Sequence, residues 1–135
     1  MRAIASAPIV LLLAFSATAI AADFDGSVPL SCTAVQANDC LPAGGACKVV
    51  KPESSTTPVF SIDFAKKEVR SPFRTTALVV QHSSDSEKSL VLQGTDRSNA
   101  WTARIDKTTG AMTITVADSK GAMVAFGQCR AAPAK

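Results

Sequence analysis

The sequence predicts an all-β protein: an antiparallel meander of about seven to eight strands that closes into a small up-and-down barrel or packs as a sandwich, stapled by disulfides. Three observations predict it. Apolar and polar residues alternate in short segments separated by turn residues. Beyond the first 21 residues, no segment keeps a helical period over three turns. Four cysteines stand in a chain that begins with an export signal.

The start of the chain has the three parts of a cleavable secretory signal peptide. Arg2 is the positive start, residues 9–15 form an apolar run too short to anchor a protein, and residues 19–21 place small side chains for signal peptidase. We expect cleavage after Ala21, with Ala22 as the close alternative. A second arginine for twin-arginine export and a lipoprotein cysteine are both missing. We therefore expect a soluble periplasmic or secreted protein with no lipid anchor and no stable membrane insertion.

Residues 22–135 are long enough for one domain with a modest core. Residues 22–45 are rich in Gly, Pro, Asp and Cys, and we expect this cysteine-containing segment to be irregular. Residues 46–130 carry the alternating pattern and are expected to form the β-meander. In the meander, Phe60, Ile62 and Phe64 share one strand face, as do Leu90 and Leu92.

Charge and aromatic content argue against several classes of partner. Removing Arg2 leaves a net charge of about +2, with basic and acidic residues interspersed, so nucleic acid and anionic membranes have no basic stripe to bind. The chain has no tyrosine and one tryptophan, which argues against an aromatic platform for carbohydrate. The oligomeric state is left open.

The four cysteines are expected to form two disulfides, because the chain is exported and lacks the paired spacing of zinc, haem or redox motifs. Three pairings are possible. We favour Cys40 with Cys47, closing a short loop, and Cys32 with Cys129, joining the two ends of the domain.

The C-terminal third can be placed in register. If residues 107–110 form a hairpin loop with Gly110 in the left-handed conformation, apolar pairs share one face and polar pairs the other. The apolar pairs are Trp101–Val116, Ala103–Ile114 and Ile105–Met112, and the polar pairs are Thr102–Thr115 and Arg104–Thr113. A similar tight turn would pair Ile62 with Val69.

A loop over residues 119–121 would then place Val116 opposite Val124 and Ile114 opposite Phe126. In that register Cys129 points outward, unless Gly127 forms a bulge, and would bridge to a segment outside the sheet.

Candidate catalytic groups are better explained as turn residues. His82 and Ser83 are adjacent, so in a strand they point in opposite directions, and no nucleophile elbow is present. Asp63 and Asp106 stand at the mouths of turns, where aspartate caps backbone amides, and this weakens a glycosidase pair that includes Glu68. The segment 23–27 lacks most ligands of a calcium loop. We expect no catalytic residue, metal or cofactor.

Trp101 and Arg104 remain as residues that could face a ligand, although they occupy opposite faces of one strand. Trp101 belongs with the apolar face and is expected in the core. Arg104 is then a surface residue, or an interior cation for an anionic ligand if the two faces are reversed.

Motifs along most of residues 22–135 resemble a group of small exported β-rich proteins of Gram-negative bacteria to which no activity is assigned. They are Phe24-Asp25-Gly26-Ser27, Pro29-Leu30-Ser31-Cys32, Ile62-Asp63-Phe64-Ala65-Lys66-Lys67, Gln93-Gly94-Thr95, Trp101 with Ile105-Asp106 and Thr109-Gly110, and Phe126-Gly127-Gln128-Cys129. The resemblance implies export and a β fold, and carries over no catalytic residue.

These observations favour a non-catalytic binding domain whose partner is an unidentified small ligand or envelope protein. An inhibitor or partner of an envelope hydrolase is the alternative, although the serine- and glycine-rich loop of lysozyme inhibitors is not visible. A hydrolase is the weakest reading. We expect the protein not to be an enzyme.

Overall fold

The computed structural model describes residues 24–51 and 57–133. The predicted signal peptide and its cleavage sites at Ala21 and Ala22 lie outside these residues. The described ranges contain ten strands: β1 Leu30–Cys40, β2 Lys48–Val49, β3 Val59–Asp63, β4 Glu68–Arg70, β5 Leu78–Val79, β6 His82–Asp85, β7 Ser89–Asp96, β8 Asn99–Asp106, β9 Ala111–Asp118 and β10 Gly121–Ala131. Within the described ranges no helix is long and apolar enough to cross a membrane.

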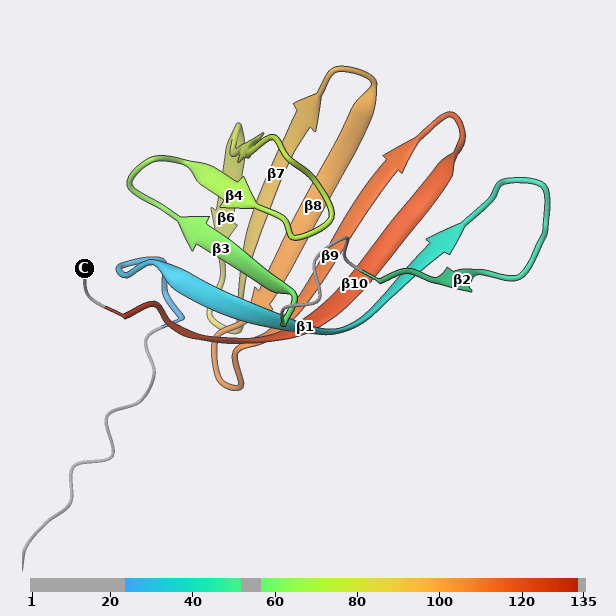
Figure 1. Ribbon diagram of the computed structural model, residues 1–135. Coiled ribbons are helices and arrows are strands. Elements are labelled where there is room, and N and C mark those ends of the chain that lie inside the picture. The colour runs from blue at the N-terminus through green and yellow to red at the C-terminus, as the bar shows by residue number, and fades with distance from the viewer. Residues whose placement is uncertain (1–23, 52–56, 134–135) are drawn as a thin grey trace, which may run out of the picture.

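The strands form one antiparallel sheet that curls into a half-barrel (Figure 1). The strand order is β5-β4-β3-β1-β10-β9-β8-β7-β6, with β2 paired to β1. The all-β antiparallel prediction is confirmed, and a single curled sheet replaces the two-sheet sandwich that the sequence left open. There are slightly more strands than expected, because β2 is an added two-residue strand and because residues 78–85 divide at a kink into β5 and β6.

The core fills the inner face of the curl. Cys32, Phe60, Ile62, Leu78, Ala103, Ile105 and Ile114 are at most 1% exposed, and Phe73 of the β4–β5 loop packs its ring 5.9 Å from that of Phe60. The predicted hairpin of β8 and β9 is confirmed in every pair, including Trp101 opposite Val116 and Arg104 opposite Thr113. Gly110 has φ of 72°, as the turn requires.

The expectation of an irregular segment over residues 22–45 was wrong for residues 30–40. β1 spans eleven of those residues and pairs with β10 on one side and β3 on the other. Its inward residues are mainly small, and a register shift between Ala34 and Gln36 interrupts their alternation. The local pattern is therefore weak, and strands distant in sequence supply the pairing.

The predicted register of β9 with β10 was wrong by one residue. Asp118 lies opposite Gly121, and its carboxylate accepts hydrogen bonds from the N–H groups of Lys120 (2.7 Å) and Gly121 (3.1 Å). This cap stabilises a two-residue loop instead of a three-residue loop. Ala125, rather than Phe126, therefore lies opposite Ile114, and Phe126 is 43% exposed.

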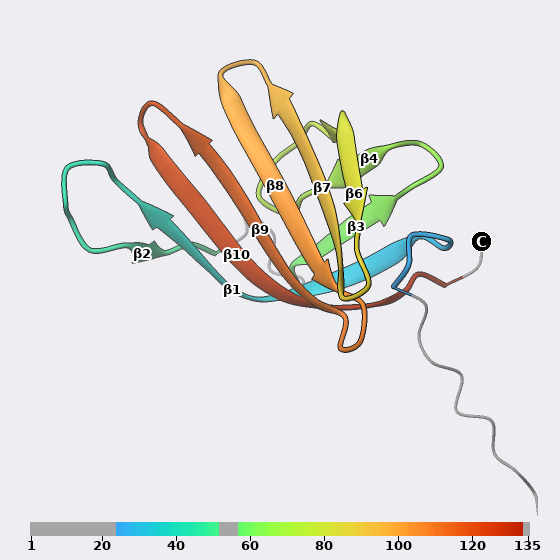
Figure 2. The same cartoon turned by 180° about the vertical axis from the view of Figure 1, so that it is seen from behind.

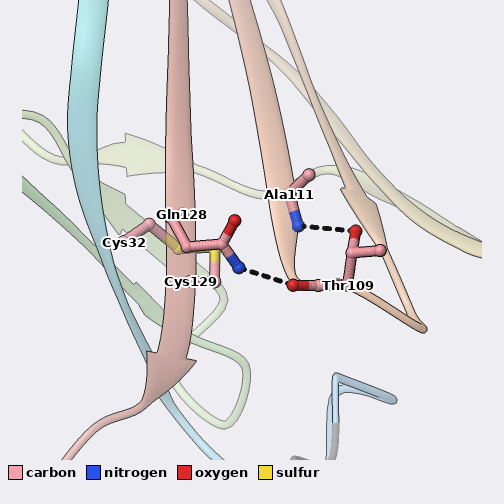
Figure 3. Close-up of a disulfide and its surroundings, with 5 residues drawn as sticks. All are labelled: Cys32, Thr109, Ala111, Gln128 and Cys129. Atoms are coloured by element: carbon pink, nitrogen blue, oxygen red, sulfur yellow. Dashed lines mark hydrogen bonds between the residues drawn. A yellow bond between two sulfur atoms is a disulfide. The ribbon is translucent and has the colours of Figure 1, made fainter.

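The same register turns Cys129 inward. It lies directly opposite Cys32 on the neighbouring strand, their disulfide is buried, and the two Cα atoms are 3.8 Å apart (Figure 3). The second disulfide joins Cys40 to Cys47, so the favoured pairing is confirmed, although the outward position of Cys129 is not. The C-terminal end of β1 and its partner β2 form an arm at the side of the half-barrel (Figure 2).

Candidate functional site

The two residues singled out as ligand-facing do not form a site together. Trp101 is 2% exposed within the core. A Cβ atom placed on its neighbour Gly94 would lie 2.7 Å from the indole Nε1, so the ring packs directly on that glycine. Among the described residues, this Nε1 has no hydrogen-bond partner. Arg104 lies on the outer face, half exposed, with its guanidinium 3.8 Å from the carboxylate of Asp106. The interior-cation alternative for Arg104 is therefore wrong.

The aspartates considered for catalysis cap turns. Asp63 accepts a hydrogen bond from the N–H of Lys66 (3.0 Å), and Asp106 accepts from those of Thr108 (3.0 Å) and Thr109 (2.9 Å). These bonds to the charged form hold the pKa of both carboxyl groups below the usual value, with the backbone bond from Lys66 or Thr109 as the largest cause.

Residues of β6 meet other parts of the chain at a cleft in the half-barrel. The cleft lies where the two ends of the sheet separate, between the β3–β4 turn and β6, and we call it the seam cleft. Its volume is about 310 Å³. It is lined by Asp25, Gly26, Phe64, Lys67, Val80, Gln81, His82, Ser83, Asp85, Leu90 and Leu92.

The kink between β5 and β6 produces the seam. The N–H of Val80 donates to the carbonyl of Lys67 (2.8 Å) on one sheet end, and the N–H of Gln81 donates to that of Gln93 (2.9 Å) on the other. Both Gln81 and His82 lie against Gln93, which is the geometry of a β-bulge. The two sheet ends therefore touch at Val80 and Gln81 and diverge beyond them.

Side chains in β6 alternate between the faces of the sheet. Ser83 and Asp85 lie opposite the inward-facing Leu92 and Leu90, so their side chains share the inner face with those leucines. His82 lies opposite Gln93 on the other face. The His82 imidazole and the Ser83 hydroxyl thus leave the strand in opposite directions, as the sequence predicted.

Two carboxylates and one ammonium group lie on the rim of the seam cleft. The Asp25 carboxylate accepts a hydrogen bond from the N–H of Ser27 (2.8 Å), and hydrogen bonding from Ser27 lowers the pKa of Asp25. Asp85 forms an ion pair with Lys107, which also donates to the carbonyl of Ser86 (3.1 Å). Lys67, from the β3–β4 turn, supplies the ammonium group.

A larger hollow of about 610 Å³ lies between residues 28–30, residues 132–133 and the β3–β4 hairpin, over Val28, Leu30 and Ile62. Its charged rim residues pair with one another: Lys66 with Asp63 at 3.5 Å, and Arg70 with Glu68 at 3.4 Å. These pairs leave the larger hollow without an unbalanced charge, so the seam cleft is the stronger candidate site.

No metal site accompanies the seam cleft within residues 24–51 and 57–133, where no group of three or more His, Cys, Asp or Glu side chains could hold an ion. Sequence reasoning considered His82 and Asp25 separately and did not bring them to one cleft. The usable signal was the consecutive apolar run Leu78-Val79-Val80, which breaks the strand alternation at the kink. Comparisons with protein-family models, with curated proteins and with solved structures found no match for this chain.

Proposed function

We propose that this protein is a non-catalytic binding domain that works outside the cytoplasm and holds its ligand in the seam cleft. The observation that carries the proposal is the cleft itself. Its floor consists of Phe64, Leu90 and Leu92, and polar groups converge on its rim. A volume of about 310 Å³ falls at the lower end of the range for ligand pockets, so a small ligand or one segment of a larger ligand fits.

The arrangement of polar groups favours binding over catalysis. A hydrolase of the serine type needs a base within hydrogen-bond reach of its nucleophile. The alternation of β6 directs His82 and Ser83 to opposite faces, and Asp63 and Asp106 are engaged with turn amides. The cleft thus offers an apolar floor and charged anchors without a base–nucleophile pair.

The two disulfides support a location outside the cytoplasm, because such bonds persist in oxidising compartments. The secretory signal in the sequence points the same way. Mass spectrometry of the protein from a bacterial periplasmic extract tests both points. We expect a chain that begins at Ala22 or Asp23 and is four hydrogen atoms lighter than the reduced mass. An uncleaved chain or free thiols would contradict this location.

Binding at the seam cleft can be tested with matched substitutions on β6. Ser83→Phe places a ring on the inner face beside Leu92 and fills the cleft, whereas Ser84→Phe places the same ring on the outer face. A small-fragment library screened by two-dimensional NMR should shift the amide signals of Ser83, Asp85 and Leu90. Ser83→Phe should abolish these shifts and Ser84→Phe should preserve them. Equal effects of the two variants would refute the site.

The second candidate function is inhibition of an envelope hydrolase, and the arm of β1 and β2 is the observation that favours it. The Cys40–Cys47 disulfide closes a loop whose residues are all exposed, with the Leu41 side chain 56% exposed. A loop held in one conformation binds at a lower entropic cost. Inhibition of a panel of peptidoglycan hydrolases and proteases should be lost in Leu41→Ser and kept in Val79→Ser, an equally exposed site elsewhere.

A further inference from the structure

β6 has one edge that is not paired with another strand of the described chain. It hydrogen-bonds to β7 alone and ends the strand order of the sheet. The N–H of Ser86 donates to the carbonyl of Ser89 (2.9 Å), which fixes the alternation of the ladder. The backbone groups of His82 and Ser84 therefore face β7, and those of Ser83 and Asp85 face away from it, toward the seam.

This edge borders the seam cleft. Ser83 and Asp85, whose backbone groups face the seam, also line the cleft together with Phe64 and Lys67 from the opposite wall. An unpaired edge presents donors and acceptors at the spacing of a strand and is a template for another extended segment. The unpaired edge of β6 therefore lies next to the apolar floor of the seam cleft.

We propose that the ligand of the seam cleft is an extended peptide segment that adds to β6 as a further strand, with one apolar side chain over Leu90 and a basic residue beside Asp25. This inference rests on the proposed binding function and names its ligand class. Main-chain bonds to Ser83 and Asp85 hold the peptide, and the alternation of its side chains directs every second one into the cleft.

The basic residue follows from charge complementarity. Asp25, Asp85 and Lys67 line the cleft, and the imidazole of His82, the other titratable residue of the lining, lies on the opposite face of β6. Lys107 forms its ion pair with Asp85 from outside the lining, and its positive charge reaches Asp25 only at longer range, without an ion pair. Asp25 accepts from the N–H of Ser27 and stays ionised at neutral pH, so it is the carboxylate to which a peptide cation is drawn.

The size of the cleft agrees with one side chain rather than a whole folded partner. At about 310 Å³ it holds one large apolar side chain together with the backbone that carries it. Leu90 is only 5% exposed, so the apolar surface that a valine or leucine of the peptide would cover belongs mainly to the half-buried Phe64.

The test uses a synthetic eight-residue peptide with valine at alternate positions, threonine between them and one central lysine. The control is the same peptide with N-methyl groups on alternate residues. It keeps every side chain but lacks the backbone N–H donors along one edge of the peptide strand. Isothermal titration with the oxidised full domain should detect the first peptide and show binding at least about tenfold weaker for the second. Replacing the lysine of the peptide by glutamate should weaken binding. In Asp25→Asn, the difference in affinity between the lysine peptide and the glutamate peptide should be smaller.

Variants on β6 separate strand addition from other binding at the seam cleft. Ser83→Pro removes a seam-facing N–H and spares the ladder to β7, so the domain should keep its melting temperature and lose most of its affinity for the peptide. Ser84→Pro removes a ladder donor and should lower the melting temperature. If Ser83→Pro fails to fold, the comparison of the methylated and unmethylated peptides still tests strand addition.

Three outcomes would overturn the inference. Equal affinity for the methylated and unmethylated peptides would exclude strand addition. Fragment binding that is lost in Ser83→Phe, with no peptide binding, would leave the proposed function standing and remove the peptide as its ligand. A dimer of the purified protein that disappears in Ser83→Pro would assign the edge to a second copy of the chain.

Discussion

Arg74 and Asp96 form an ion pair between two segments that are 22 residues apart in the chain. Arg74 lies in the loop between β4 and β5, and Asp96 ends β7. The two side chains are 21% and 26% exposed, so the pair is largely shielded from water. It fastens the loop that carries Phe73 to the opposite part of the sheet.

The first prediction concerns this ion pair. A double-mutant cycle with Arg74→Met and Asp96→Asn should give a coupling free energy of about 1–2 kcal/mol, because shielded charges interact more strongly than exposed ones. The matched control is Glu68 with Arg70, whose arginine side chain is 66% exposed. That cycle should give less than about 0.5 kcal/mol in urea unfolding. Equal couplings would contradict the fastening role.

The second prediction concerns the close approach at Gly94. An added Cβ would lie 2.4 Å from the carbonyl oxygen of Val79 and 2.7 Å from the Trp101 indole, one a rigid backbone atom and the other a buried ring. Gly94→Ala should therefore destabilise the fold by about 1–3 kcal/mol and change the fluorescence of Trp101. Gly45→Ala is the control, since its Cβ would meet nothing within 4 Å. Similar unfolding midpoints for the two variants would refute the packing argument.

The third prediction ranks the disulfides. Cys32–Cys129 spans 97 residues and Cys40–Cys47 spans 7, so the first removes more entropy from the unfolded chain. Replacing Cys32 and Cys129 by alanine should lower the free energy of unfolding by about 5 kcal/mol. Replacing Cys40 and Cys47 by alanine should lower it by about 2–3 kcal/mol. Urea titrations followed by Trp101 fluorescence measure both. A larger loss from the Cys40 and Cys47 variant would reverse the ranking.

The fourth prediction concerns acid stability at the β8–β9 turn. Hydrogen bonds from Thr109, then Thr108, lower the pKa of Asp106 below the usual 3.8 in the folded protein. Its contribution to stability is therefore complete above 3.8 and is lost as the pH falls through the folded pKa. Thr109→Val removes the hydroxyl donor at 3.1 Å and should raise the pKa of Asp106 toward 3.8.

Carbon-detected NMR titration of the Asp106 carboxyl measures this shift directly. Asp106→Asn should make the loss of stability below pH 3.8 shallower than in the wild type, because the variant has no proton to bind at that position. An Asp106 that titrates at 3.8 or above in the folded domain would show that the turn does not favour its charged form.

The seam cleft shows why a site can escape sequence reasoning. Its walls come from the segment before β1, the β3–β4 turn, the kink and β7, and nothing in their spacing along the chain links them. The sequence singled out Trp101, which was correctly expected in the core, because a lone tryptophan is conspicuous. The features that shape the cleft are the curl of the sheet and the break in alternation at residues 78–80.

The sequence alone determined what depends on neighbours along the chain: the all-β class, the β8–β9 hairpin and the turn caps at Asp63 and Asp106. It favoured the observed cysteine pairing among three possibilities, but the inward position of Cys129 came from the tertiary structure. Tertiary structure decided the rest. β1 became a central strand because β3 and β10 pair with it, and Phe126 lost its core position because the Asp118 cap shifted the register. The seam cleft exists because the two ends of the sheet meet at Val80 and Gln81 and then diverge, a relationship set by contacts between distant residues.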